Sequence, residues 1–123
     1  MIDPSPQKYS RMTKQGRAVW MTERLWELAR DLPVRYVAIS EIEGLDQNLW
    51  FGPQDVPTCR AVALHARRIS ESDLGYPIIL SANGDLMDGG HRICKAWMLG
   101  HTEIAATQFE EDPEPDYFLQ DAI

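Results

Sequence analysis

Cysteine is scarce in this sequence, and the two cysteines present have no metal-binding context. Cys59 and Cys94 are the whole complement in 123 residues, with no Cys-x-x-Cys spacing and no paired histidines beside them. Such usage gives no indication of a disulfide framework or a zinc site. We therefore expect a reduced, cytoplasmic setting.

Long apolar runs are lacking as well. No stretch approaches the ~18 consecutive apolar residues that span a bilayer. The first ten residues, MIDPSPQKYS, lack the apolar centre of a signal peptide. The expectation is a soluble, intracellular protein that does not contact a membrane.

Positive charge is in short supply, and more than half of the basic residues lie in the first 35 positions. The net charge is -7, which disfavours tight binding to a nucleic-acid backbone. Residues 1–35 nevertheless hold seven basic side chains, whereas residues 102–123 hold seven acidic ones and no basic one. Lys8, Arg11, Lys14 and Arg17 recur every three residues, which indicates either a basic stripe for an acidic partner or an ordinary solvated face.

The length and the hydrophobic patterning predict one domain. We expect a flexible tail over residues 1–12, a single domain over 13–110 and an acidic tail over 111–123. Within the domain the patterns predict helices over 13–31, from an N-cap at Asp55 or Thr58 to about 70, and over 91–100, with strands over 34–39, 76–80, 85–87 and 102–109. Asn83-Gly84 predicts a type I′ hairpin turn. This order is typical of an α+β fold with a small mixed sheet flanked by helices.

The segment MDGGHRICKAWMLG carries the sharpest functional signal. Gly89 and Gly90 precede His91 and Arg92 at the start of a short amphipathic helix. A helix N-terminus offers unpaired amides to an anion, glycine permits close approach, and arginine grips phosphate oxygens. The alternative is that Asp88 caps the helix and the glycines only make a turn.

The chain from Val34 to Phe109 resembles the ParB/sulfiredoxin-like domains. The resemblance rests on a strand, a helix, a hairpin, a "D-G-x-H-R" type box that opens a helix, Leu-Gly and a final strand, in that order. It implies a ParB/sulfiredoxin-like fold in which Gly89, Gly90, His91 and Arg92 bind the phosphates of a nucleotide (ATP, ADP or CTP) with Mg²⁺. Related small-molecule kinases imply catalytic roles for Asp88 and Glu41, and metal binding by Glu41 and Glu43.

The departures from the family limit this reading. Sulfiredoxins have a cysteine immediately before the His-Arg pair, and Gly90 stands there in this chain, so the thiolate chemistry of that enzyme is absent. An acidic tail follows where ParB proteins continue into a helix-turn-helix domain, so that route to sequence-specific DNA binding is not expected.

The leading hypothesis is therefore a domain that binds a phosphate-bearing small molecule. The sequence leaves open whether nucleotide hydrolysis or phosphoryl transfer follows binding. The alternative is a domain that keeps the fold and binds a protein partner or a second copy of itself. A ParB-like nuclease or DNA-associated protein ranks third.

Overall fold

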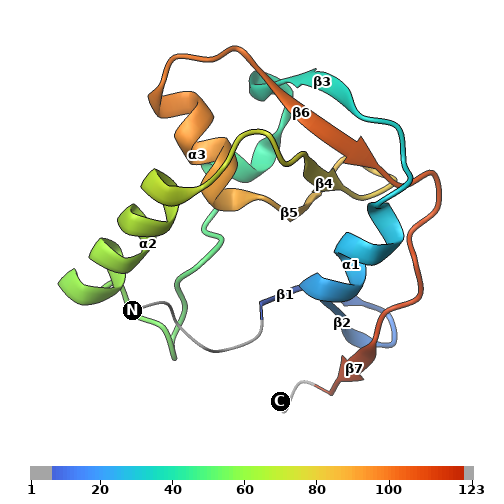
Figure 1. The fold of residues 1–123 in the computed structure, drawn as a ribbon. Helices are drawn as coiled ribbons and strands as arrows, with labels where there is room; N and C mark the ends of the chain where they lie inside the picture. Colours follow the sequence, from blue (N-terminus) through green and yellow to red (C-terminus); the bar gives the residue numbers. More distant parts are fainter. Residues whose placement is uncertain (1–6, 121–123) are drawn as a thin grey trace.

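The computed structural model describes residues 7–120, which form two β-sheets and three α-helices (Figure 1). An antiparallel sheet has the order β1-β2-β7, with β1 at Lys8–Thr13, β2 at Gly16–Met21 and β7 at Tyr117–Leu119. A mixed sheet has the order β3-β6-β4-β5, with β3 at Arg35–Ala38, β6 at Glu103–Gln108, β4 at Ile78–Leu80 and β5 at Leu86–Asp88. Strand β4 runs parallel to β6, and the other pairs are antiparallel. The expected α+β class with a mixed sheet is confirmed.

The helices are α1 at Thr22–Ala29, α2 at Cys59–Glu71 and α3 at Gly90–Met98. Two 3-10 turns, Ile39–Glu41 and Glu43–Asp46, follow β3. Of the two expected N-caps, Asp55 and Thr58, Thr58 starts helix α2, and its hydroxyl accepts a hydrogen bond of 3.1 Å from the amide of Ala61. Within residues 7–120, no helix is both long and apolar enough to cross a membrane.

The mixed sheet is packed on both faces. Ile78 and Leu80 point to one side, where they join α3 residues Ile93 and Ala96 in a buried core. Ile79, between them, points to the other side and packs with Leu25 of α1. This alternation is the period-2 pattern of a strand buried on both faces. Strand β2 and helix α1 thus cover one face of the sheet, while α3 covers the other.

The N-terminal region differs from the helix expected over residues 13–31. Residues 8–21 form the β1-β2 hairpin, and helix begins only at Thr22. Gly16 has φ +115° at the turn, a conformation that side-chain-bearing residues rarely adopt, and the Thr13 hydroxyl donates to the Gly16 carbonyl at 2.7 Å. Residues 8–12, expected in a tail, therefore belong to a sheet, and residues 1–6 of that tail lie outside the described residues.

The C-terminal acidic segment also takes part in the fold. Tyr117, Phe118 and Leu119, which lie in the expected acidic tail, pair with β2 as β7. The Asp112 carboxylate binds the Arg11 guanidinium and the amide of Ala82, with distances of 2.7 Å and 2.8 Å. Residues 121–123 of the expected tail lie outside the described residues.

The turn between β4 and β5 is not the type I′ turn that Asn83-Gly84 predicted. A type I′ turn needs positive φ at both central residues, and among residues 7–120 positive φ occurs only at glycines. Gly84 has φ +89° and its amide donates to the Ser81 carbonyl at 2.9 Å. Gly84 therefore ends a turn that begins at Ser81, and β5 still leads the chain to the DGGHR segment.

The end of α3 follows the prediction. Gly100 has φ +82°. Its amide donates to the Trp97 carbonyl at 3.0 Å, and the His101 amide donates to the Ala96 carbonyl at 2.9 Å. This pair of bonds is the Schellman motif, which satisfies carbonyls that the helix leaves open.

Candidate functional site

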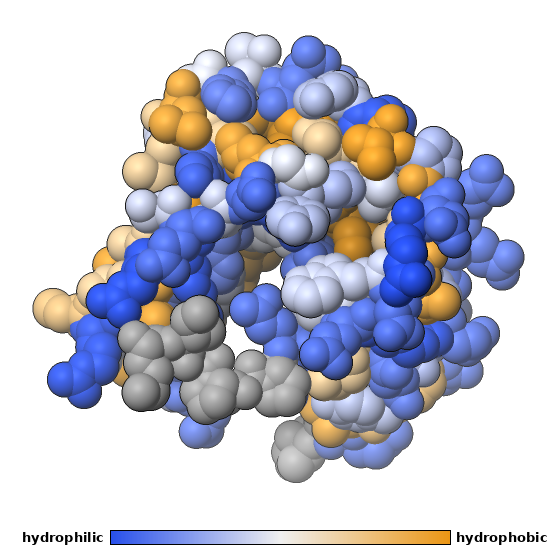
Figure 2. All heavy atoms as spheres, in the orientation of Figure 1, coloured by the Kyte–Doolittle hydropathy of each residue, from blue (hydrophilic) through white to orange (hydrophobic). Residues whose placement is uncertain are grey.

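A large cavity lies between α1 with the β1-β2 hairpin on one side and α2 with α3 on the other. It has a volume of about 940 Å³, and Figure 2 shows the surface hollowed in the centre of that view. The DGGHR segment contributes to its wall from Asp88 to Arg92. Sequence reasoning thus located one wall of the cavity. The opposite wall comes from α1, which lies within the expected helix, and from Lys8 and Tyr9 of β1, which were expected in a tail.

Helix α3 starts at this cavity without a side-chain cap. Gly89 is the N-cap residue, with φ +120°, and within the described part of the chain no side chain caps the first turn. Asp88, the expected cap, lies one position too early, and its carboxylate is bound elsewhere. The alternative in which Asp88 simply caps the helix is therefore wrong, and the helix keeps the open N-terminus that favours an anion.

Both glycines have a packing reason to be glycine. A Cβ at Gly89 would lie 2.4 Å from Cγ2 of Ile78, inside the core. A Cβ at Gly90 would lie 2.9 Å from Cδ1 of Leu49 and 3.3 Å from the Trp50 ring. The missing side chains therefore let β4 and the loop that carries Trp50 approach the start of the helix. The reason expected from the sequence was a different one, the close approach of a phosphate oxygen.

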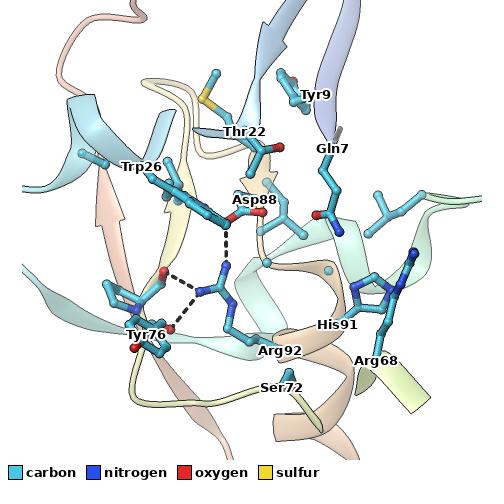
Figure 3. Close-up of a pocket in the computed structure, with 18 of the residues that line it drawn as sticks. Gln7, Tyr9, Thr22, Trp26, Arg68, Ser72, Tyr76, Asp88, His91 and Arg92 are labelled. Carbon is cyan, nitrogen blue, oxygen red and sulfur yellow. Dashed lines mark hydrogen bonds and ion pairs between the residues drawn. The ribbon is translucent and has the colours of Figure 1, made fainter. Parts of the chain in front are cut away.

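Asp88 and Arg92 form the polar centre of the cavity wall. Nη2 of Arg92 lies 2.7 Å from Oδ2 of Asp88, and the side chains are only 14% and 11% exposed. The same oxygen accepts a hydrogen bond of 2.7 Å from the indole Nε1 of Trp26. Nη1 of Arg92 donates to the carbonyls of Tyr76 and Pro77 at 3.3 Å and 3.2 Å. Figure 3 shows the guanidinium between these partners, so its charge is compensated within the protein.

His91 lies in an aromatic cluster with Trp50 and His65. Its Nε2 is 2.8 Å from Nδ1 of His65, and both imidazoles stack on the Trp50 indole with centroid distances of 4.5 Å. Burial, followed by the charges of His65, Arg68 and Arg92, lowers the pKa of His91 to about 4. His91 is therefore neutral near pH 7 and acts there as a hydrogen-bonding group, not as the cation expected from sequence.

The cationic character of the cavity comes largely from residues that sequence reasoning did not select for it. Arg68 of α2, Lys8 of β1 and Arg30 at the end of α1 line it together with Arg92. Figure 3 shows Arg68 beside His91. Among residues 7–120, four basic residues of the lining face three acidic ones (Glu71, Asp73 and Asp88), which gives this part of the lining a formal charge of +1 in a chain of net charge -7.

Glu41 and Glu43 do not join this site. Strand β3 ends at Ala38, so both residues fall in the following 3-10 turns, where they are exposed. Neither lines the cavity. Among residues 7–120, no cluster of three or more histidine, cysteine or acidic side chains is placed to hold a metal ion.

Comparisons with protein-family models, with curated proteins and with solved structures found no match to this chain.

Proposed function

We propose that the protein binds a phosphate-bearing small molecule, specifically a nucleotide, in the cavity at the start of α3. The observation that carries the proposal is the uncapped N-terminus of α3, which lies in the wall of a cavity of about 940 Å³. Unpaired amides and the helix dipole favour an anion at this end. The cavity volume falls within the range of small-molecule sites.

The charge of the lining supports the same ligand. A phosphate group gains from nearby guanidinium and ammonium groups, and the cavity concentrates Lys8, Arg30 and Arg68 in an acidic protein. Arg68 lies beside His91 at the start of α3 (Figure 3), so we assign the phosphates to Arg68 and the α3 amides, with His91 as a neutral donor. The resemblance to ParB/sulfiredoxin-like domains, in which this box binds nucleotide phosphates, points to the same ligand class.

We do not extend the proposal to a reaction. Asp88, the expected catalytic base, holds Arg92 and Trp26 through one oxygen, which is a positioning role. The expected magnesium ligands Glu41 and Glu43 do not line the cavity, so the described residues do not fit the metal site that the resemblance implies. Any magnesium would enter with the nucleotide's own phosphates.

Calorimetric titration with ATP, ADP and CTP in the presence of Mg²⁺ tests the proposal. Arg68→Gln should weaken binding by about 10-fold, because a charge-assisted hydrogen bond contributes about 1.5–3 kcal/mol. Arg67→Gln is the matched control, since Arg67 neighbours Arg68 on α2 but does not line the cavity, and it should leave binding unchanged. The proposal is wrong if no nucleotide binds, or if both variants have the same effect.

A partner-binding domain is the second candidate, and one surface favours it. Trp97, Met98 and Leu99 at the end of α3 are 62%, 68% and 60% exposed. Adjacent exposed apolar side chains of this size are typical of interaction surfaces. Two results together would favour this candidate. The protein would self-associate in sedimentation experiments in a concentration-dependent way that Trp97→Ser abolishes, and it would bind no nucleotide.

A further inference from the structure

The aromatic side chains of the cavity differ in whether their rings already have ring partners. Tyr9 lies 5.6 Å from Trp20 between ring centroids, and Trp50 stacks on the two histidines. Among residues 7–120, no ring contact is found for the other two, Trp26 and Tyr76. These two are 54% and 67% exposed. Their rings are thus the ones still available to an aromatic ligand.

Trp26 is also held in a fixed position. Its Nε1 donates to Oδ2 of Asp88 at 2.7 Å, and Asp88 is held in turn by Arg92. Although Trp26 is 54% exposed, its indole is anchored at its polar edge, and the residue lines the cavity. A ring fixed before binding loses little conformational entropy when a ligand stacks on it.

The arrangement gives the cavity two chemically different sides. Figure 3 shows Trp26 and Tyr76 on one side and Arg68 and His91 on the other, with the Asp88–Arg92 pair between them. Arg92 connects the aromatic side to the first turn of α3, since it bonds Asp88 and the carbonyl of Tyr76. A nucleotide has the same polarity, with a flat aromatic base at one end and phosphates at the other.

We infer that Trp26 is the stacking platform for the base of the bound nucleotide, with the phosphates directed toward Arg68 and the start of α3. The inference rests on the proposed function and adds which part of the ligand each side holds. Every base has a π-face, so a stacking platform tolerates different bases. The site should therefore accept ATP and CTP with similar affinity.

The test compares ATP with inorganic tripolyphosphate, which has the phosphate chain but no base. Calorimetry with Mg²⁺ is carried out on the full chain and on Trp26→Ala, Trp26→Phe and Trp97→Ala. Loss of one stacked base corresponds to about a 5- to 150-fold loss of affinity. Trp26→Ala should weaken ATP binding by at least about 5-fold and leave tripolyphosphate binding within about 2-fold, whereas Trp26→Phe should retain most of the ATP affinity.

The outcomes separate the inference from the function on which it rests. If the unmodified protein binds neither ATP nor tripolyphosphate, the proposed function is wrong. If it binds both and Trp26→Ala binds ATP equally well, stacking on Trp26 is wrong while phosphate binding stands. If Trp26→Ala weakens both ligands equally, Trp26 acts only through Asp88 and the phosphate side, which also overturns the platform.

Trp97→Ala is the matched control, since Trp97 is similarly exposed but does not line the cavity; it should change neither affinity. Fluorescence covers the case in which Trp26→Ala does not fold. Stacking of a base on Trp26 should quench part of the emission when ATP is added, and Trp26→Phe should lack that part. Equal quenching in the two proteins would contradict the inference.

Discussion

His65 and His91 form one hydrogen bond between ring nitrogens, 2.8 Å long, across the gap between α2 and α3. Their planes are 17° apart and their centroids are 5.1 Å apart, so the rings lie edge to edge on the same side of Trp50. Such a bond needs one proton between the two nitrogens. A second proton would place two N–H groups against each other and break the bond.

This pair predicts a loss of stability in mild acid. The pKa of His91 falls from 6.5 to about 4 on folding, so the unfolded chain binds a proton more readily than the folded one. The contribution of neutral His91 to the free energy of unfolding is fully present above pH 6.5 and is lost as the pH falls toward 4. The thermal midpoint of the unmodified protein should decrease over this pH window. The difference between its thermal midpoint and that of the His91→Gln variant should shrink as the pH falls. A difference that is constant with pH would contradict the assignment.

Trp50 should control the titration of His91. Trp50→Ala removes the surface that buries the two rings, so the pKa of His91 should rise toward its ordinary value. The C–H protons of the imidazole ring report this directly in a proton NMR titration. The same change should destabilise the protein by about 1–3 kcal/mol, because it removes a large half-buried aromatic ring that also contacts Gly90. An unchanged pKa of His91 in this variant would show that residues other than Trp50 bury the His91 imidazole.

Gly89 and Gly100 provide a matched pair at the two ends of α3. Both have positive φ, +120° and +82°, but only Gly89 lacks room for a side chain. Gly100→Ala should cost about 1 kcal/mol from backbone strain alone. Gly89→Ala should cost about 2–4 kcal/mol, because its Cβ would also collide with Ile78. Urea unfolding measures both, and equal costs would mean that Ile78 moves aside freely.

Asp112 should hold the C-terminal segment to the rest of the fold. Its two carboxylate oxygens bind Arg11 and the amide of Ala82, so Asp112→Ala leaves a partly buried guanidinium without this partner. We expect a loss of about 1–2 kcal/mol in unfolding free energy. Asp46→Ala, at an exposed acid in a 3-10 turn, is the control and should have little effect. Similar losses in both variants would indicate a general charge effect.

The part of the fold that sequence predicted well is the part specified by local patterns. The apolar run at Ile78–Leu80, the Thr58 cap and the Gly100 stop each act within a few residues, and the structure contains all three features. The β1-β2 hairpin was missed because Val19 and Met21 also fit a helical stripe that continues into α1. The pairing of β2 with β7, nearly a hundred residues away, favours a strand over a helix at these residues. No local sequence pattern indicates that pairing.

The site shows the same division. The DGGHR segment was correctly placed at a strand-to-helix turn, because its elements are adjacent in sequence. Arg68 and Trp26 were not selected, since each reaches the cavity from a separate helix and is recognisable only once the helices are placed. Glu41 and Glu43 were selected on the assumption that β3 continues past Ala38, and the strand ends there instead.

Strand β7 pairs with β2, and the hairpin that β2 shares with β1 supplies Lys8 and Tyr9 to the cavity. During synthesis on a ribosome, the hairpin emerges long before its third strand does. The wall that it builds can therefore reach its final form only after residue 119 has left the exit tunnel, although α3 and its open N-terminus have formed earlier. A ligand added to stalled nascent chains should stabilise chains that expose β7 and have little effect on those that stop before Asp116.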